Sequence, residues 1–560
     1  MSTSAELVFL PLGGAGEIGM NMYLYGVGPE RDRQWIMVDC GVTFGDMETT
    51  PGVDLIMADP NFIAAQSDRL HGLFLTHAHE DHVGALGRLW PELDCPVYAR
   101  RFTARIAEGK MSEAGLDTSV IKVCPAMPKM IQAGPFKVGF MPISHSIPEA
   151  SALVIEAGGH RIVHSGDFKV DRDPQVGEPF DPAAFEALGR KGVDALVCDS
   201  TNVFSPNPGR SEAEIVAPIA ELVKGAKGLV IATTFASNIA RLRTLAAAAK
   251  GAGRSVALQG RAMQRMLAAA RETGVLKDFP EILSEERMLD TPAQHLMVLA
   301  SGSQGERRAA VAQIANGSSP RVRAEPGDMV LFSSKTIPGN EKSVARIVNR
   351  FSEQGAQVVD DSGGLYHVSG HANRPDLQQL HRLVKPKLLV PMHGEHRHLV
   401  EHAALAAESD IPSLVVTNGS VARLAGGPVA IVGSAETGRL YLDGSLLIGA
   451  FDGVVRDRLK LALRGLVIAA VVVDQDGDLA ADPVVRIQGV ANDLDEAVGT
   501  LSAAMEDAID AAFDRANGKQ LRNNDAIETL VTSTCSQLVR RLTGRKPVVT
   551  VMVSRVEVDG

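Results

Sequence analysis

Short apolar runs separated by turn residues fill the first two hundred or so positions of the chain. Examples are ELVFLPL, RQWIMVDCG, GLFLTH, SALVIEAG and HRIVHSGD, which are rich in residues that favour strands. Few stretches in residues 6–45 or 70–203 repeat at the helical period. The pattern therefore predicts a β-rich half with short connections.

The pattern changes at Ser211. Glu214 follows it by three positions, which is the spacing of a helix-capping box. From there to about residue 365, apolar runs such as GLVIATTF and HLMVLASG alternate with helical stretches such as SNIARLRTLAAAAKG. This alternation predicts a parallel α/β sheet.

The remaining part of the chain divides into three stretches. Residues 374–417 continue the strand–helix pattern, and residues 418–445 are Gly-rich and turn-like. Beyond residue 456, the apolar runs LVIAAVVV and VVTVMVSRV predict a small α+β domain with two helices on one face of its sheet. A long amphipathic helix at 493–516 packs either inside this domain or against another subunit.

Composition narrows the function classes. With 560 residues the chain has room for several domains. A net charge of -11 argues against non-specific binding of nucleic acid over the whole surface, and 4% aromatic residues argue against many base-stacking platforms. Five scattered cysteines without a CxxC pair predict buried, reduced thiols in a cytoplasmic protein. We expect no signal peptide and no membrane span, because the longest apolar run falls far short of the ~20 residues required.

Strong metal ligands crowd one short loop. His77, His79, Asp81 and His82 follow the apolar run GLFLT, and imidazole with carboxylate suits Zn²⁺ or Mn²⁺. Alternation along a strand places His77 and His79 on one side, so that Asp81 and His82 can turn toward a second ion. One loop cannot complete two coordination shells. Further ligands of the right type end other apolar runs: Asp39, His145, Asp167 and His393.

A second motif competes for the N-terminal region. Residues 14–19, GAGEIG, fit the GxGxxG pattern of dinucleotide sites, and Asp39 lies at a suitable distance beyond them. A dinucleotide site requires a helix next, whereas the following MNMYLYGVG has strand character. We therefore favour a tight turn in a β-sandwich over a nucleotide site.

The HxHxDH loop with downstream His and Asp resembles the metallo-β-lactamase superfamily of metal hydrolases. More specifically, roughly residues 6–450 resemble the bacterial ribonuclease J family, within the β-CASP nuclease branch. The motifs that carry this resemblance are GGAGEIGMN, THAHEDHVGAL, HSGDFK, CDST, ATTFASNI, SGSQGE, KTIPGNE, YHVSGHA and PMHGEHRH. The resemblance implies an αββα sandwich with an inserted Rossmann-like β-CASP domain, followed by the small C-terminal α+β domain.

The resemblance also divides the chain and distributes the ligands. It implies a metallo-β-lactamase domain in two parts (1–209 and 366–440), a β-CASP domain (210–365), a linker (441–458) and a C-terminal domain (459–560). Two divalent ions are implied, Zn²⁺ first, with Mn²⁺ or Mg²⁺ as alternatives. The implied ligands are His77, His79 and His145 for one ion, Asp81, His82 and His393 for the other, Asp167 between them, and Asp39 as the residue that orients ligands.

A second cluster, in YHVSGHA, has the composition of a phosphate cradle: two imidazoles, a hydroxyl and a glycine. By resemblance, His367 and Ser369 with Ser237 receive the 5′-monophosphate of an RNA end. His371 is implied near the scissile phosphate, and the implied catalytic set is Asp81, Asp167, His371 and Asp199. The alternatives are a hydrogen-bonded structural turn for the cluster and a purely structural Asp199. Arg241, Arg261 and Lys335 are either contacts to the RNA backbone or solvated helix residues.

The implied function is hydrolysis of single-stranded RNA, 5′→3′ from monophosphorylated ends and also internally, in RNA processing and mRNA decay. Self-association as a homodimer or homotetramer and binding to RNA-decay partners are also implied. Three alternatives stay open: a β-CASP nuclease acting on DNA or transcript 3′ ends, a small-molecule metallo-hydrolase, and a non-catalytic scaffold. The scaffold is disfavoured because every expected ligand position holds a suitable residue.

Overall fold

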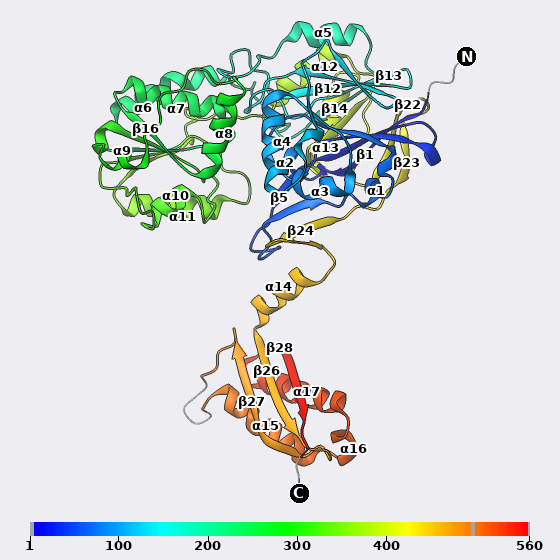
Figure 1. The fold of residues 1–560 in the computed structure, drawn as a ribbon, viewed down its shortest axis with the longest axis vertical. Helices are drawn as coiled ribbons and strands as arrows, with labels where there is room; N and C mark the ends of the chain where they lie inside the picture. Colours follow the sequence, from blue (N-terminus) through cyan, green and yellow to red (C-terminus); the bar gives the residue numbers. More distant parts are fainter. Residues whose placement is uncertain (1–4, 494–498, 558–560) are drawn as a thin grey trace. The chain divides into compact units, whose positions relative to one another are not determined.

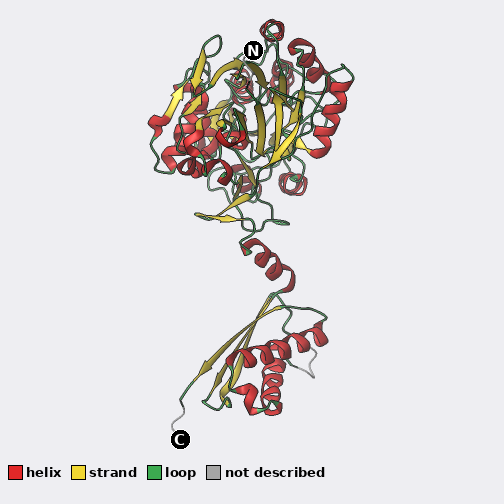
Figure 2. Ribbon diagram, turned by 90° about the vertical axis from the view of Figure 1, so that its right-hand side faces the viewer, coloured by secondary structure: helices red, strands yellow, loops and turns green. Residues whose placement is uncertain are grey.

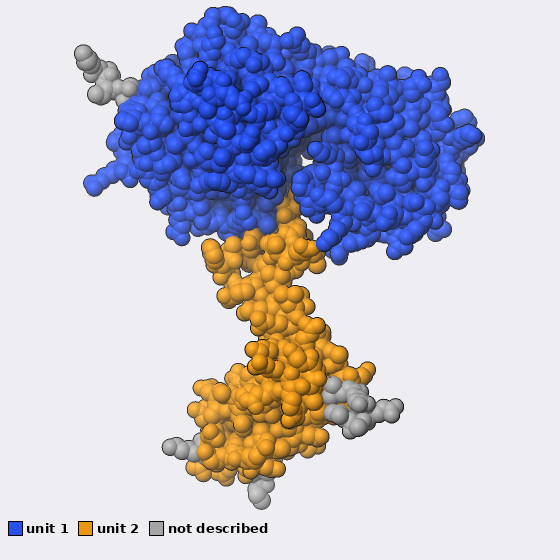
Figure 3. Space-filling model, turned by 180° about the vertical axis from the view of Figure 1, so that it is seen from behind, with its two compact units in different colours: residues 1–43, 56–440 blue, residues 44–55, 441–560 orange. Residues whose placement is uncertain are grey.

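The computed structural model describes residues 5–493 and 499–557. It divides into two compact units (Figure 3), one of residues 1–43 and 56–440 and the other of residues 44–55 and 441–560. Within the described ranges, no helix combines the length and the hydropathy that crossing a membrane would require. All five cysteines are buried and unpaired, as predicted.

Two sheets form the centre of the larger unit. The eight-stranded sheet contains, in spatial order, β23 (Ala430–Ser434), β22 (Ser420–Ala425), β1 (Leu7–Gly13), β3 (Met22–Val27), β4 (Gln34–Val38), β7 (Leu70–Leu75), β8 (Val97–Ala99) and β9 (Ile121–Val123). The six-stranded sheet contains β10 (Met130–Ala133), β11 (Phe136–Pro142), β12 (Ser151–Ala157), β13 (His160–His164), β14 (Ala195–Asp199) and β20 (Leu389–Met392). Buried side chains from both sheets, among them Phe9, Tyr25, Phe140 and Ile155, form one core between them.

Helices cover the outer faces of this sandwich (Figure 2). The helices of this part of the chain are α1 (Asn61–Ala64), α2 (Glu80–Val83), α3 (Leu86–Leu93), α4 (Arg101–Glu113), α5 (Pro182–Arg190), α12 (Arg374–Val384) and α13 (His396–Ala407). Phe185 of α5, Leu377 of α12 and Leu405 of α13 pack on the outer face of the six-stranded sheet, while α4 contacts β8 and β9. The predicted αββα architecture is confirmed.

A parallel five-stranded sheet forms the inserted α/β region. Its strands are, in spatial order, β16 (Ser255–Gln259), β17 (Leu296–Ala300), β15 (Val230–Thr233), β18 (Met329–Phe332) and β19 (Gln357–Val359). Helices α6 (Val216–Gly225), α7 (Ile239–Gly251) and α8 (Arg261–Glu272) share one hydrophobic core, and α9 (Glu285–Leu289), α10 (Ala310–Ala315) and α11 (Glu341–Glu353) share another. Figure 1 shows α6 and α7 on the opposite side of this sheet from α10 and α11. The predicted parallel sheet is confirmed, as is the capping box of Ser211 and Glu214.

The glycine motif forms a turn, as favoured, and the dinucleotide alternative is wrong. Gly14, Gly16 and Gly19 all have positive φ, and the strand β3 follows where a nucleotide site would need a helix. Within the turn, β2 (Ala15–Gly16) pairs with β21 (Gly394–Glu395). The turn therefore contacts the segment directly after His393.

Residues 418–445 differ from the sequence prediction. They contain β22 and β23, which extend the eight-stranded sheet, and β24 (Arg439–Asp443); β25 (Leu446–Gly449) follows. Two of the glycines with positive φ, Gly419 and Gly426, flank β22 rather than interrupt it. The sequence prediction failed here because turn glycines on both sides of a short strand give the stretch a composition typical of a loop. The other short strands are β5 (Val42–Phe44) and β6 (Leu55–Ala58).

The smaller unit has a three-stranded sheet in the order β27 (Leu479–Gln488), β26 (Leu466–Val473), β28 (Val548–Arg555). Its helices are α14 (Val454–Arg464), α15 (Leu501–Arg515), α16 (Gly518–Leu521) and α17 (Asn524–Thr543). Alternate residues of β26 are buried, and α15 and α17 lie on one side of the sheet (Figure 2), as predicted. The helix predicted at 493–516 is described from Leu501 on, and residues 494–498 lie outside the described residues. Its buried side chains, such as Met505 and Ile509, pack inside this unit.

Candidate active site

Strand ends bring the candidate ligands to one edge of the sandwich. Asp39 follows β4, and His77 follows β7 after one residue; these two strands pair in parallel. In the other sheet, Asp199 ends β14 and His393 follows β20, and these strands also pair in parallel. Carboxyl ends of neighbouring parallel strands meet at the same edge, so residues far apart in the chain converge there.

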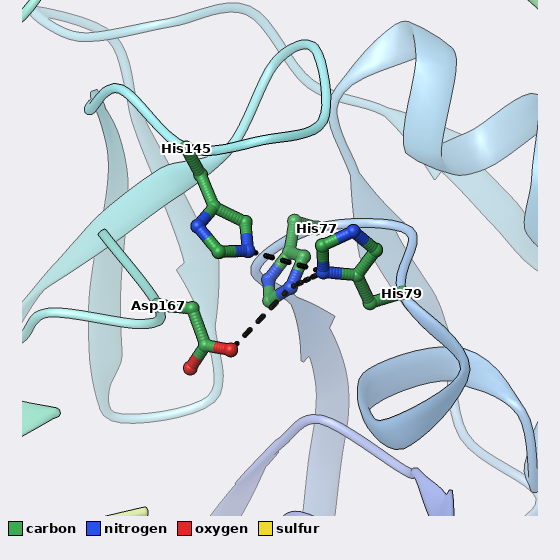
Figure 4. A group of neighbouring side chains, drawn as sticks. All are labelled: His77, His79, His145 and Asp167. Atoms are coloured by element: carbon green, nitrogen blue, oxygen red, sulfur yellow. Dashed lines mark hydrogen bonds and ion pairs between the residues drawn. The ribbon is translucent and has the colours of Figure 1, made fainter. Parts of the chain in front are cut away.

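Three histidines and one aspartate form a first group. His77, His79, His145 and Asp167 point toward one another (Figure 4). The Nδ1 atom of His79 lies 3.1 Å from the Nε2 atoms of both His77 and His145, and His77 Nε2 lies 3.8 Å from Asp167 Oδ2. Nitrogens about 2.0 Å from one tetrahedral ion would be roughly 3.3 Å apart. The spacing of the imidazoles therefore fits a shared cation.

The protonation state of these histidines is also compatible with a shared cation. Burial, followed by the neighbouring imidazoles, holds the pKa of His77 and of His145 well below 6.5. Burial lowers the pKa of His79 to about 4. All three rings are therefore neutral at physiological pH, which is the form that binds metal.

A second group shares Asp167 with the first. His82 Nε2 lies 3.1 Å from Asp167 Oδ2 and 3.5 Å from Asp81 Oδ2. His393 Nδ1 lies 3.0 Å from Asp167 Oδ1, and its Nε2 lies 3.3 Å from Asp81 Oδ2. Burial alone would lower the pKa of His82 and His393, but the carboxylates, Asp167 first, raise it well above 6.5. A divalent cation would compete with these protons for the same nitrogens.

Asp39 holds the ligand loop in place. Its Oδ2 accepts from His82 Nδ1 at 2.7 Å and from the Thr76 hydroxyl at 2.8 Å, and its Oδ1 accepts from the Thr76 backbone N–H at 2.8 Å. Burial raises the pKa of Asp39, and the contact with His82 opposes that shift. Because Asp39 binds Nδ1, Nε2 of His82 is the nitrogen left to face Asp167, which is the usual arrangement behind a metal-binding histidine.

Asp199 and His371 lie beside the two ligand groups. His371 Nδ1 donates to Asp199 Oδ2 at 2.8 Å and lies 3.9 Å from Asp167 Oδ2. Burial disfavours the charged ring, yet Asp199 raises the pKa of His371 above 6.5. Asp199 Oδ1 accepts from the backbone N–H and hydroxyl of Thr201. Asp199 therefore fixes the position of His371 next to Asp167.

The cradle residues adjoin this centre. His145 Nδ1 donates to the carbonyl of Gly370 at 2.6 Å, so the cradle loop contacts the first ligand group directly. Ser369 Oγ accepts from Asn202 Nδ2 at 2.8 Å and from the backbone N–H of His371 at 3.1 Å. Both contacts use the oxygen as an acceptor, so the Ser369 hydroxyl is able to donate to a ligand. Ser237 lies just before α7, with intermediate exposure.

Comparisons with known proteins match every part of this architecture. Family models match residues 16–197 (Metallo-beta-lactamase superfamily), 227–351 (Ribonuclease J, beta-CASP domain), 365–416 (Zn-dependent metallo-hydrolase RNA specificity domain) and 453–556 (Ribonuclease J C-terminal domain). Ribonuclease J of Sinorhizobium meliloti is 43% identical over 562 residues, which cover 99% of this chain and 98% of that protein. The chain belongs to the ribonuclease J family.

Other relatives agree. Ribonuclease J of Mycolicibacterium smegmatis is 36% identical over 84% of both chains, and that of Synechocystis is 32% identical over 98% of this chain and 86% of its own. A crystal structure of an Enterococcus faecalis protein of unknown function aligns with a TM-score of 0.50 at 16% identity, covering 76% of this chain and 100% of that one, and supports the fold alone. As a member of the ribonuclease J family, the chain is a metal-dependent hydrolase that acts on RNA.

One predicted contact to RNA is wrong. Arg241 is fully buried: its Nε and Nη2 donate to both carboxylate oxygens of Glu212, at 2.6 and 3.0 Å. Its Nη1 donates to Ser333 and to the carbonyl of Tyr366, and lies 3.3 Å from His367 Nδ1. Arg241 therefore supports the cradle from behind and is neither a solvated residue nor a contact to the RNA backbone. Arg261 and Lys335 are exposed, and their contact with RNA stays a prediction.

Two asparagines of the site were not predicted from the sequence. Asn21 Nδ2 lies 3.0 Å from His82 Nε2 and donates to the carbonyl of Asp81. Asn202 Nδ2 contacts Ser369 and the carbonyl of His371. Asn21 ends the quoted motif GGAGEIGMN and Asn202 directly follows CDST, and these positions were the available signal.

Proposed function

We propose that this chain degrades single-stranded RNA 5′→3′ from monophosphorylated ends and also cuts internally, in RNA processing and mRNA decay. The observation that carries the proposal is the direct connection between the cradle and the metal-ligand groups. Gly370 contacts His145, and Asn202 links Ser369 to His371. A terminal phosphate held at this cradle would leave the next linkages of the strand close to the ligand groups.

We assign His77, His79 and His145 to one divalent ion, Asp81, His82 and His393 to a second, and Asp167 to both. Neutral imidazoles at tetrahedral spacing favour Zn²⁺ over Mn²⁺ or Mg²⁺. When bound, such ions lower the pKa of a water and neutralise charge on a phosphoryl group.

The remaining residues act on the strand itself. Asp199 holds Nδ1 of His371, so Nε2 is the nitrogen able to donate to a phosphoryl or departing oxygen. The partly exposed Asp81 and the buried Asp167 would hold the ions, and hydrogen bonds to Asp39 fix the ligand loop. Removing Asp199 would release the His371 ring from this position.

The cradle supports a preference for one phosphate. Ser369 offers its hydroxyl, and Ser237 lies at the N-terminal end of α7, where the helix dipole favours an anion. Burial and the nearby Arg241 and Lys335 lower the pKa of His367 to about 3, so this ring is a neutral hydrogen-bonding group in a cationic surrounding. A compact monophosphate matches such a cradle better than a triphosphate does.

Boundaries, assembly and location belong to the proposal as well. We assign residues 1–209 and 366–440 to the catalytic domain, 210–365 to the β-CASP domain, 441–458 to a linker and 459–560 to a C-terminal domain. The last would aid self-association as a homodimer or homotetramer. We place the protein in the cytoplasm, with RNA-decay proteins as partners.

A cleavage assay tests the proposal. The purified chain is incubated with one RNA bearing a 5′-monophosphate, a 5′-hydroxyl or a 5′-triphosphate, with and without a chelator. We expect mononucleotides, released fastest from the monophosphate, and no release with chelator. His371→Ala should slow release about 10²- to 10³-fold, whereas His160→Ala, at the half-buried His160, is the matched control. Equal rates on all three ends, or cleavage of duplex DNA alone, would refute it.

A further inference from the structure

Phe204 is an exposed aromatic ring. Its exposed fraction is 50%, and no other phenylalanine described in the larger unit is exposed. The preceding residue, Val203, is fully buried in the core below the six-stranded sheet and anchors the loop. The ring is thus held at the surface by a fixed backbone, although half of its apolar area stays exposed to water there.

A cation and an imidazole flank this ring. The Arg397 guanidinium carbon lies 5.6 Å from the centre of the Phe204 ring, and the His398 ring contacts it edge-on at 5.2 Å. Arg397 also pairs with Glu395 at 2.9 Å, yet its side chain is 70% exposed. An exposed guanidinium over an aromatic face can move aside for a flat ligand or stack on its other side.

The cluster lies on segments that carry the active site. The Phe204 loop leaves β14 directly after Asp199, and Asn202 in this loop contacts Ser369 and His371. Arg397 is in the first turn of α13, which follows His393 and the short strand β21. Since β14 and β20 pair in parallel, both segments leave the same sheet edge.

We propose that Phe204 and Arg397 form a stacking platform for one nucleobase of the RNA bound at the active site. The inference rests on the proposed function, because it takes single-stranded RNA as the ligand. Every base has an aromatic face, so the platform would tolerate any sequence, and Arg397 would add local positive charge to an acidic chain. One platform agrees with an aromatic content of 4%. A single ring and one cation are too small an area for a stable protein interface.

A binding experiment with fluorescent RNA tests the platform. The probe is a 5′-monophosphorylated RNA with 2-aminopurine at one position at a time, bound to metal-loaded full-length His371→Ala protein, in which cleavage should be slow compared with the binding measurement. We expect quenching at one position and loss of that quenching in Phe204→Ala, with an affinity lower by about 5- to 100-fold. Phe204→Trp should keep the quenching, and Phe204→Leu, which retains the apolar bulk, should lose it. The matched control is Phe451→Ala, which removes a ring that is 94% exposed in the smaller unit.

An abasic RNA separates stacking from structural damage. When the base at the quenched position is removed, Phe204→Ala should no longer weaken binding, because the partner of the ring is already absent. Equal weakening of intact and abasic RNA would overturn the proposal, as would unchanged affinity for intact RNA, which would leave a protein contact as the role of Phe204. Cleavage by the unmodified chain is measured separately, so a failure of the proposed ribonuclease function is distinguishable from a failure of the platform.

Discussion

The buried ion pair behind the cradle gives a sharp stability prediction. Arg241 and Glu212 are 0% and 2% exposed, and the guanidinium makes two short contacts with the carboxylate. Arg241→Met keeps most of the apolar volume but leaves the carboxylate buried without its cation. It also removes the donors to Ser333 and Tyr366. Losing one partner of such a pair costs about 3–5 kcal/mol of the free energy of unfolding.

A second substitution should restore much of this loss. Glu212→Gln in the Arg241→Met background removes the unpaired charge, so we expect the double variant to recover about half of the lost stability. The matched control is the exposed pair of Arg265 and Glu113, with side chains 60% and 58% exposed, where Arg265→Met should cost less than about 1 kcal/mol.

The assay is urea unfolding of each full-length variant, followed by the preference for 5′-monophosphate over 5′-hydroxyl RNA. Arg241→Met should also reduce the proposed preference for a 5′-monophosphate, because Arg241 connects α7 to the segment that carries His367. An Arg241→Met variant within about 1 kcal/mol of the unmodified chain would refute the reasoning. So would a double variant that is as unstable as the single one.

Three further predictions concern the site. The pKa of His367 is lowered to about 3, so between pH 6.5 and 3 the unfolded chain binds a proton that the native chain does not, and native stability is lost as pH falls. Between pH 7 and pH 5, the free energy of unfolding should therefore fall by about 2 kcal/mol less in His367→Asn than in the unmodified chain. Urea midpoints that change with pH in parallel for the two proteins would contradict this. Chelation should abolish RNA hydrolysis and lower the melting temperature, with recovery on adding Zn²⁺. Metal analysis should find about two ions per chain in the unmodified protein and about one in Asp81→Asn. An equal metal content in the two proteins would exclude Asp81 as a ligand. His371→Ala should lower kcat on RNA about 10²- to 10³-fold with little change in KM, and a change confined to KM would assign His371 to binding alone.

The ligand loop was predictable because its information is local. The spacing of His77, His79, Asp81 and His82 after one strand is visible in the sequence, and only the pairing with distant residues required a resemblance. The structure brings His393 within 3.3 Å of Asp81, because β20 lies beside β14 in the second sheet. The position of an apolar run within a sheet is a tertiary property that its own sequence does not encode.

Burial of single polar residues was not predictable for the same reason. Arg241 lies in the Ala-rich helix α7, whose composition leaves several faces equally able to face the core. Its carboxylate partner comes from the turn before α6, and its other acceptors come from segments much later in the chain. The role of Asn202 was not predictable either, because it consists of contacts with Ser369 and His371, which lie near Asn202 only in the folded chain.

The net charge of -11 and the RNA substrate are reconciled by where the cations lie. The negative average excludes attraction over the whole surface, but it says little about a site only a few ångströms across. Burial, together with Arg241 paired to Glu212 and with Lys335 and Lys169, lowers the pKa of the half-buried His367 ring, and two divalent ions at the ligand groups would add four charges. Under the proposed function, binding energy would thus be concentrated at the end and the reacting linkage of the strand. An acidic surface elsewhere would keep the rest of an RNA from adhering, so the proposed selection for a free 5′ end would be consistent with the charge distribution that argued against general nucleic-acid binding.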